Sequence, residues 1–498
     1  MIRPTKRGNR IETVILPQPY VDRQGLRDSI ESRLIKLQVE GIEWLSPQRR
    51  SWRIRTEDWQ SRLAMVASIR QGDSRVVPAQ AVLEESEHRK SWNVKYLSHG
   101  WHRYVGRFPP QIVRAVLNAF RIARPQVILD PFAGSGTTLV EAKLMAIDAI
   151  GFEICPLSHL ISEVKCRLDF PAEQLERAWA FVRKDLEHMR PTSLPHYLAQ
   201  ETPVDTYRVP EFPNKEKWFN RDVLKNITLL LSAISRLDDV AARQFLFVAL
   251  SASMRSLANV DVDVVRTEYR RRPRVGVDVM AVVGGKVHRM VDDLRTYTKM
   301  RFPPAKVSCR LGDARRLDLS SSSIDFAMTS PPYGIEAISY LRTHMLSYRV
   351  LAPVLGMGYD ELARKMIGTE FVMDWNLTSR NLVSPTAQKL LYSYKRTTRQ
   401  EKNRVAQMIQ YFQDIEKSLC EIGRVLKPAG HAAIIIGNKK LLGRTIPADV
   451  ILQETARHFS LNTRRVLPVK LVCNNPTSQT PWSERMIRDE HIIFLEKE

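Results

Sequence analysis

Cysteine is scarce in this 498-residue chain, and long apolar runs are missing. The five cysteines are scattered and no CxxC pair occurs, so we expect neither a disulfide framework nor a structural zinc site. The longest apolar stretches, residues 227–234 and 431–437, fall far short of the roughly 20 residues that a membrane helix needs. The basic N-terminal segment precedes no apolar run long enough for a signal peptide. We therefore expect a cytoplasmic protein with no membrane partner.

Acidic residues are also in deficit. Lysine and arginine number 76 against 54 aspartates and glutamates, so the formal net charge is +22. Such a surplus favours a polyanionic partner, most often nucleic acid, over a basic protein without one. Hydrophobic residues make up 44% of the chain, which is enough for a large core and excludes an intrinsically disordered chain. At roughly 100–200 residues per domain, the length predicts about two to four domains.

The pattern of residues divides the chain into four segments. Residues 1–95 form an N-terminal region of unknown role, with one amphipathic helix expected over 25–41. Residues 96–170 and 301–498 alternate short buried strands with helices, which is typical of an α/β fold with a doubly wound, mostly parallel sheet. Residues 171–300 interrupt this rhythm as a mainly helical insertion. We treat the insertion as a candidate target-recognition region.

Arginine is concentrated in one stretch of this insertion, where residues 266–274 contain five. We identify Arg270, Arg271, Arg272 and Arg274 as candidate contacts to DNA phosphates. A solvated surface turn is the alternative interpretation of the same residues.

A glycine-rich turn follows the first strand of the α/β pattern. The strand expected over 127–130 ends in Asp130, and the turn reads Phe132-Ala133-Gly134-Ser135-Gly136-Thr137. A turn of this kind lets the backbone approach a ligand closely and aims helix N–H groups at it. No lysine follows Gly136, so a phosphate-binding P-loop is not expected, and Leu139 stands where a dinucleotide loop has its third glycine.

Two acidic residues complete a candidate cofactor pocket. Glu153 ends the next expected strand, where a carboxylate can accept both hydrogens of a ribose diol. Asp313, followed by Ala314, can accept a hydrogen bond from an adenine amino group. Taken alone, Glu153 or Asp313 is explained as a surface residue or a helix-capping residue. The ordered set of loop, diol carboxylate and adenine carboxylate describes a pocket for S-adenosylmethionine.

A strand expected over 323–328 leads into Thr329-Ser330-Pro331-Pro332-Tyr333. Together with the loop that begins at Asp130, this element resembles the amino-methylating DNA methyltransferases, whose catalytic motif is (Asp/Asn/Ser)-Pro-Pro-(Tyr/Phe). The stretch 426–430 is similar to the turn before a late strand of class I methyltransferases, with Ala429 in place of a glycine. The resemblance implies a class I fold, S-adenosylmethionine as cofactor and double-stranded DNA as partner.

The chemistry of amino methylation explains the motif. An exocyclic amino nitrogen is a poor nucleophile because its lone pair is delocalised into the ring. Acceptors at Ser330 Oγ and the Pro331 carbonyl can hydrogen-bond its N–H groups and localise that lone pair, and prolines offer no competing N–H. Tyr333 can stack on a base swung out of the helix. We therefore predict that Ser330, Pro331, Pro332 and Tyr333 are catalytic.

Serine at the first motif position favours, within the family, cytosine N4 over adenine N6. No cysteine follows a proline, which disfavours methylation at cytosine carbon 5. The resemblance implies a restriction–modification system, in which a cognate restriction endonuclease is an expected partner. An RNA guanine-N2 methyltransferase and a non-catalytic DNA-binding module are the alternatives. A second insertion at about 357–404 competes with residues 171–300 for target recognition.

Two polar residues shortly after the motif, Arg342 and His344, can contact a phosphate or the target base. A helix with polar residues on its exposed face explains them as well, so we do not count them as catalytic.

Overall fold

The computed structural model describes residues 94–189, 209–261, 267–270, 272–335, 338–470 and 489–498, and the backbone of three short strands before residue 94. Those strands, β1 (Thr13–Ile15), β2 (Ser68–Gln71) and β3 (Ser74–Val76), pair in an antiparallel sheet. The helix expected over 25–41 and Arg271 lie outside the described residues.

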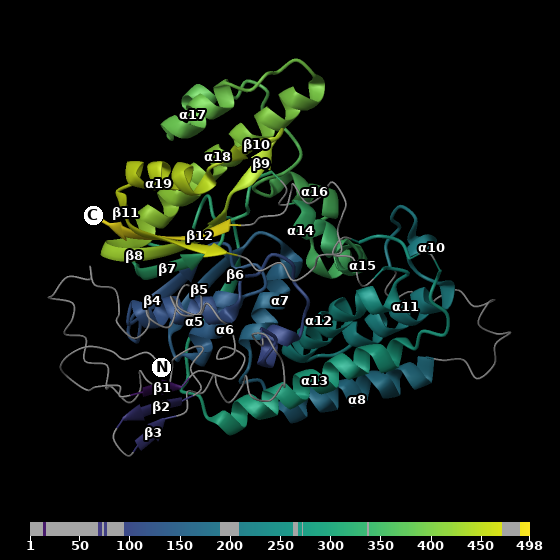
Figure 1. The fold of residues 1–498 in the computed structure, drawn as a ribbon. Helices are drawn as coiled ribbons and strands as arrows, with labels where there is room; N and C mark the ends of the chain where they lie inside the picture. The colour runs from purple at the N-terminus through teal and green to yellow at the C-terminus, as the bar shows by residue number, and fades with distance from the viewer. Residues whose placement is uncertain are drawn as a thin grey trace.

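Seven strands form the main sheet, in the order β11-β12-β8-β7-β4-β5-β6 (Figure 1). Their bounds are β4 (Val127–Asp130), β5 (Asp148–Glu153), β6 (Val307–Leu311), β7 (Ile324–Thr329), β8 (Leu426–Gly437), β11 (Leu461–Lys470) and β12 (Asp489–Lys497). The strands β4 to β8 pair in parallel, whereas β12 runs antiparallel between β8 and β11. This arrangement confirms the doubly wound, mostly parallel class I sheet that the sequence predicts.

Helices cover both faces of the sheet (Figure 1). α5 (Pro110–Ala119), α6 (Thr137–Leu144) and α7 (Pro156–Cys166) lie on one face. α18 (Arg399–Val425) and α19 (Ala448–His458) lie on the other. With both faces covered, the central strands are buried on both sides, which explains why they read as short, nearly continuous apolar runs.

The helical insertion lies in the chain between α7 and β6. Its helices are α8 (Ala172–Met189), α10 (Lys215–Trp218), α11 (Arg221–Ser235), α12 (Val240–Leu257) and α13 (Val279–Met300). Ile227 and Leu231, which are four residues apart and so share one face of α11, are both buried. Phe245 of α12 packs against Trp101 and Phe170, so the insertion shares its core with the first segment. We propose the limits 96–170, 171–300 and 301–498 as segments of the chain.

The expected turn at 426–430 is a bulge inside β8, which corrects the sequence interpretation. Ile324 and Phe326 of β7 pair with Leu426 and His431, so four residues of β8 stand opposite one of β7. Ala429 adopts a left-handed conformation with φ of 55°. Because pairing resumes on either side of this bulge, residues 426–437 form one strand.

Several short helices follow the Ser-Pro-Pro-Tyr element. The first are α14 (Ile338–Thr343) and α15 (Met345–Leu355), and the second insertion, about 357–404, contains α16 (Tyr359–Lys365), the 3-10 turn η4 (Ser379–Asn381) and α17 (Pro385–Tyr392). A further 3-10 turn, η3 (Leu97–Gly100), precedes α5, and β9 (Lys439–Leu441) pairs with β10 (Arg444–Ile446) as a hairpin. Within the described ranges, no helix is both long and apolar enough to cross a bilayer.

Candidate active site

A pocket opens at the carboxyl ends of β4, β5 and β7, where open α/β sheets bind their ligands. Four stretches that lie far apart in the sequence form most of its wall: residues 131–135, 153–154, 312–314 and 330–333. Among the predicted site residues, those that line the pocket are Phe132, Ala133, Gly134, Ser135, Thr137, Glu153, Asp313, Ala314, Ser330, Pro331, Pro332 and Tyr333. Asp130 and Gly136 lie behind the wall. The structure thus brings the predicted cofactor loop and the predicted catalytic motif to one pocket.

The loop between β4 and α6 needs its glycines. Gly134 and Gly136 have φ values of 53° and 82°, in the left-handed region that favours glycine. A Cβ atom at Gly136 would lie 2.5 Å from Ser162 Oγ on α7. The turn is closed by the Gly136 N–H, which donates to Ala133 O at 2.7 Å. These glycine conformations therefore hold the backbone of residues 132–136 close to the pocket.

Asp130 connects the loop to β7, the strand that leads into the predicted catalytic motif. Its side chain is buried, and Oδ1 accepts hydrogen bonds from Phe132 N at 3.1 Å and from Thr329 Oγ1 at 2.6 Å. Burial raises the pKa of Asp130 to about 6. Since Thr329 directly precedes Ser330, the Asp130 carboxyl group fixes the distance between the two halves of the site.

Glu153 faces the pocket from the end of β5. Its Oε2 accepts a hydrogen bond from Gly134 N and its Oε1 accepts one from Cys155 N, each at 2.8 Å. Burial raises the pKa of this carboxyl group to about 7. Each carboxylate oxygen can accept a second hydrogen bond, so Glu153 can bind a diol while it holds the loop.

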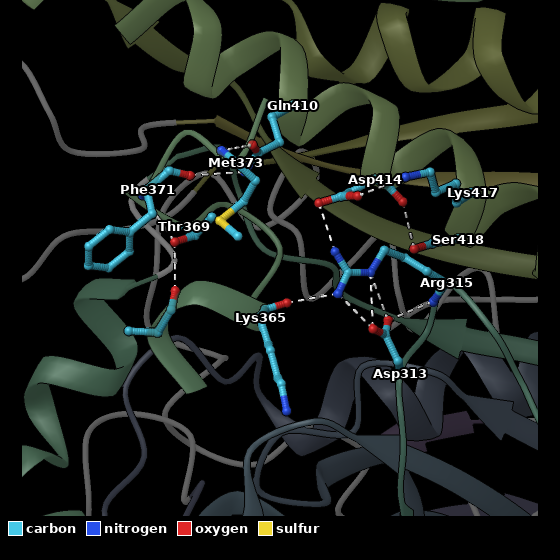
Figure 2. A network of polar contacts seen from close by, with 11 residues as sticks. Asp313, Arg315, Lys365, Thr369, Phe371, Met373, Gln410, Asp414, Lys417 and Ser418 are labelled. Atoms are coloured by element: carbon cyan, nitrogen blue, oxygen red, sulfur yellow. Dashed lines mark hydrogen bonds and ion pairs between the residues drawn. The ribbon is translucent and has the colours of Figure 1, made fainter. Parts of the chain in front are cut away.

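Asp313 belongs to a network that the sequence did not reveal (Figure 2). Its carboxylate is bridged by Arg315, whose Nη2 lies 2.6 Å from Asp313 Oδ2. Arg315 also donates from Nη1 to Asp414 Oδ2 on α18 at 2.9 Å, and from Nη2 to Lys365 O at 2.8 Å. An adenine amino group at Asp313 would therefore share this carboxylate with a guanidinium group.

The predicted catalytic motif is held by hydroxyl groups. Ser330 Oγ donates to Tyr333 Oη at 3.0 Å, and Tyr411 Oη of α18 donates to Pro332 O at 2.7 Å. Tyr333 also hydrogen-bonds Glu490 of β12, whose pKa is raised by burial. Since the Ser330 hydroxyl directs its only hydrogen toward Tyr333, its lone pairs stay available as acceptors.

Two stretches of the pocket wall were missed by the sequence interpretation. Residues 104–108 line it ahead of α5, and the ring of Tyr104 lies 3.4 Å from where a Cβ atom of Gly134 would sit. The cluster of aromatic and basic residues between Trp101 and Phe108 is a signal that could have found this stretch. Met366 and Ile367, which belong to the second insertion, line another part of the wall, and no local sequence pattern marks them.

The arginine-rich stretch lies beside α14, since Thr267 Oγ1 donates to Arg342 O at 2.9 Å. Arg270 and Arg272 are exposed. The Arg274 side chain turns inward instead, where Nη1 donates to Ser256 O at 2.8 Å. Of the described arginines in this candidate set, Arg270 and Arg272 are thus the ones placed to meet a ligand from solvent.

Comparisons with known proteins agree with this geometry. Residues 31–161 match the N6_N4_Mtase family, described as DNA methylase. This match agrees with the resemblance of the chain's motifs to the amino-methylating DNA methyltransferases. S-adenosylmethionine is the cofactor of these enzymes and of this chain.

Similar curated proteins are type II methyltransferases. The chain is 23% identical over 438 residues to M.MvaI of Kocuria varians, a match that covers 81% of this chain and 92% of the relative. It is 22% identical over 456 residues to M.BsoBI of Geobacillus stearothermophilus, a match that covers 80% of this chain and 85% of the relative. A solved structure of a DNA modification methylase from Thermus thermophilus is 12% identical with a TM-score of 0.19, and the match spans 37% of this chain and about half, 52%, of that one.

Proposed function

We propose that this DNA methyltransferase methylates the exocyclic amino group of a base flipped out of double-stranded DNA, with cytosine N4 as the target atom. The observation that carries the proposal is the arrangement of Ser330 beside the cofactor loop. Its Oγ lines the pocket and directs its hydrogen to Tyr333, which leaves acceptor lone pairs for an amino group.

The pocket wall fits S-adenosylmethionine. Glu153 retains acceptor capacity for the ribose hydroxyls, the backbone of Gly134 approaches the pocket without a side chain, and Asp313 and Ala314 form the wall proposed for the adenine. When bound, the cofactor supplies an electrophilic methyl group on a sulfonium. The roles of Asp130 and Gly136 are indirect in this proposal, because both position the loop from behind.

The residues of the motif prepare the amino group. Ser330 Oγ and the Pro331 carbonyl accept hydrogen bonds from its two N–H groups, so its lone pair is directed toward the cofactor side of the pocket. The ring of Tyr333 supports the flipped base. Tyr411 keeps the motif backbone in place through Pro332 O. Rate is gained by positioning the two reactants, and no covalent enzyme intermediate is needed.

Serine at position 330 supports cytosine N4, and adenine N6 is the runner-up within the same mechanism. The net charge of +22 and the exposed Arg270 and Arg272 support a duplex DNA substrate. Target recognition by residues 171–300, a cytoplasmic location and a cognate restriction endonuclease belong to the same proposal.

The test is incubation of the purified protein with unmethylated genomic DNA and labelled S-adenosylmethionine, followed by digestion to nucleosides and mass spectrometry. We expect N4-methylcytosine. N6-methyladenine would retain the mechanism and reject the serine preference. Labelled DNA should be absent with Ser330→Ala, which should still bind the cofactor. If the wild-type protein methylates no base in DNA, the proposal is wrong.

A further inference from the structure

A second pocket adjoins the active site. Its polar wall consists of His102, Arg103, Ser251, Arg255, Thr343, His344 and Ser347. No aspartate or glutamate lines it, although two arginines and two histidines do. A wall of this composition favours an anionic ligand.

The charges around this pocket act on one another. Burial, assisted by the positive charges of Lys165, Arg255 and Arg103, lowers the pKa of His344 to about 4. Burial also lowers the pKa of Arg255, with an added contribution from Arg103. Among the described residues, the carboxylate of Asp261 acts on Arg255, and the backbone oxygen of Asp261 accepts a hydrogen bond from Arg255 Nη2 at 2.8 Å. The residues that line the pocket thus contribute two guanidinium groups and no carboxylate.

One polar atom in this wall is left for a ligand. His344 Nε2 is buried and has no hydrogen-bond partner among the described residues. By contrast, His102 Nε2 is hydrogen-bonded to Ser251 Oγ at 2.8 Å. A buried imidazole nitrogen without a partner costs free energy that a bound ligand can recover.

The second pocket lies between the active site and the arginine-rich stretch. Val105 lines both pockets, and Tyr104 of the active-site wall stacks on His344 with ring centroids 5.0 Å apart. On the other side, Thr267 donates to the backbone of Arg342, which is adjacent to Thr343 and His344 of the second pocket. A DNA strand whose target base enters the active site and whose backbone reaches Arg270 would pass this pocket.

We propose that the second pocket binds a backbone phosphate of the DNA strand that carries the target base. This inference rests on the proposed function. Arg103, which is exposed, and the partly buried Arg255 supply the charge, and His344 Nε2 supplies a hydrogen-bonding atom at the pocket wall. A phosphate contact of this kind fixes the strand relative to the active site and carries no sequence information itself.

The test compares Arg103→Gln and Arg255→Gln with Arg183→Gln. Arg183 is exposed on α8, so the control removes the same charge outside the pocket. We expect each pocket variant to raise the KM for DNA roughly tenfold and to lower the slope of log affinity against log salt by about one. The kcat and the dissociation constant for S-adenosylmethionine should not change, and Arg183→Gln should behave as wild type.

A second arm uses duplexes in which single phosphates around the methylated base are replaced by neutral methylphosphonates. One replacement should weaken binding to the wild type and have no further effect on Arg103→Gln. This variant alters an exposed side chain, so the test stands even if Arg255→Gln fails to fold.

The outcomes separate the two proposals. If wild-type protein methylates no DNA, the proposed function fails. If DNA is methylated but the pocket variants match Arg183→Gln, only the phosphate site is wrong. A rise in the dissociation constant for S-adenosylmethionine, with DNA affinity intact, would assign the pocket to the cofactor carboxylate and overturn the inference.

Discussion

At the scale of single residues, the role proposed for Glu153 predicts that cofactor binding depends on pH. Its pKa is raised from 4.5 to about 7, mainly by burial. Between these values the folded chain holds a proton that the unfolded chain has lost, so the contribution of Glu153 to stability falls as pH rises through this window. The ionised form is the one that accepts two ribose hydroxyl hydrogens. We therefore expect S-adenosylmethionine to bind more tightly as pH rises toward about 7.

The measurement is isothermal titration calorimetry between pH 4.5 and 7 in two buffers with different ionisation enthalpies. Binding should release protons, so the observed heats should differ between buffers. Equal heats would mean that Glu153 does not change its protonation when the cofactor binds.

Tyr333→Phe tests the hydroxyl chain without removing the aromatic ring. The change deletes the acceptor of the Ser330 hydrogen and the partner of Glu490. The Ser330 hydroxyl can then turn its hydrogen toward the amino group, where it competes as a donor. We expect kcat to fall about tenfold to hundredfold, equivalent to ~1.5–3 kcal/mol, with DNA affinity retained. An unchanged kcat would mean that Tyr333 acts only by stacking on the base and that its hydroxyl group is not required.

At the scale of elements, the strand–turn–helix unit at 127–144 depends on one backbone conformation. Gly136→Ala places a Cβ atom at φ of 82° and 2.5 Å from Ser162 Oγ. We expect a loss of about 1–3 kcal/mol in the free energy of unfolding and loss of cofactor binding, measured by urea unfolding and calorimetry.

The matched control is Gly285→Ala in the middle of α13. Apart from the local helix backbone, no atom of the described residues lies within 4 Å of the added Cβ. Because alanine is also the better helix former, we expect a gain of about 0.5–1 kcal/mol in the free energy of unfolding. Similar losses in the two variants would show that Gly136 is not specially required.

The contact between α18 and the loop after β6 supports another prediction. Arg315 bridges Asp313 and Asp414 and also binds Lys365 O, one residue before the pocket residue Met366 (Figure 2). Arg315→Gln leaves two acids close together without their shared cation. We expect the dissociation constant for S-adenosylmethionine to rise about tenfold while kcat at saturating cofactor stays within about twofold. A lower kcat with unchanged cofactor affinity would contradict this role.

At the scale of the whole molecule, the helical insertion and the sheet share one core. Phe245 of α12 is fully buried between Trp101 and Phe170, with ring centroids 5.6 and 4.8 Å away. Trp101 Nε1 also donates to Asp293 Oδ2 of α13 at 2.8 Å. Phe245→Ala should therefore cost about 3–5 kcal/mol and lower the stability of both parts together. Circular dichroism and tryptophan fluorescence should report one coincident transition, whereas separate transitions would show independent units.

The central sheet and the two motifs of the site follow from the sequence alone. The loop 132–137 could be recognised because left-handed backbone conformations require glycine at particular positions. Such positions can be read from a few neighbouring residues of the sequence. Strands β4, β5 and β7 could be placed for a similar reason, since their apolar runs follow directly from burial on both faces. Residues Ser330–Tyr333 were predicted to be catalytic because they resemble the family's catalytic motif, and the need of an amino group for acceptors without donors explains that motif.

Which side chains meet depends on the tertiary structure. The sequence around Asp313 does not indicate whether its carboxylate faces an adenine or Arg315. Asp414, which completes the network around Arg315, lies 99 residues away in the sequence. Met366, Tyr104 and the second pocket are likewise products of segments that fold together from distant parts of the chain. A few neighbouring residues determine local conformational preference, whereas the partners of a side chain depend on how remote elements pack.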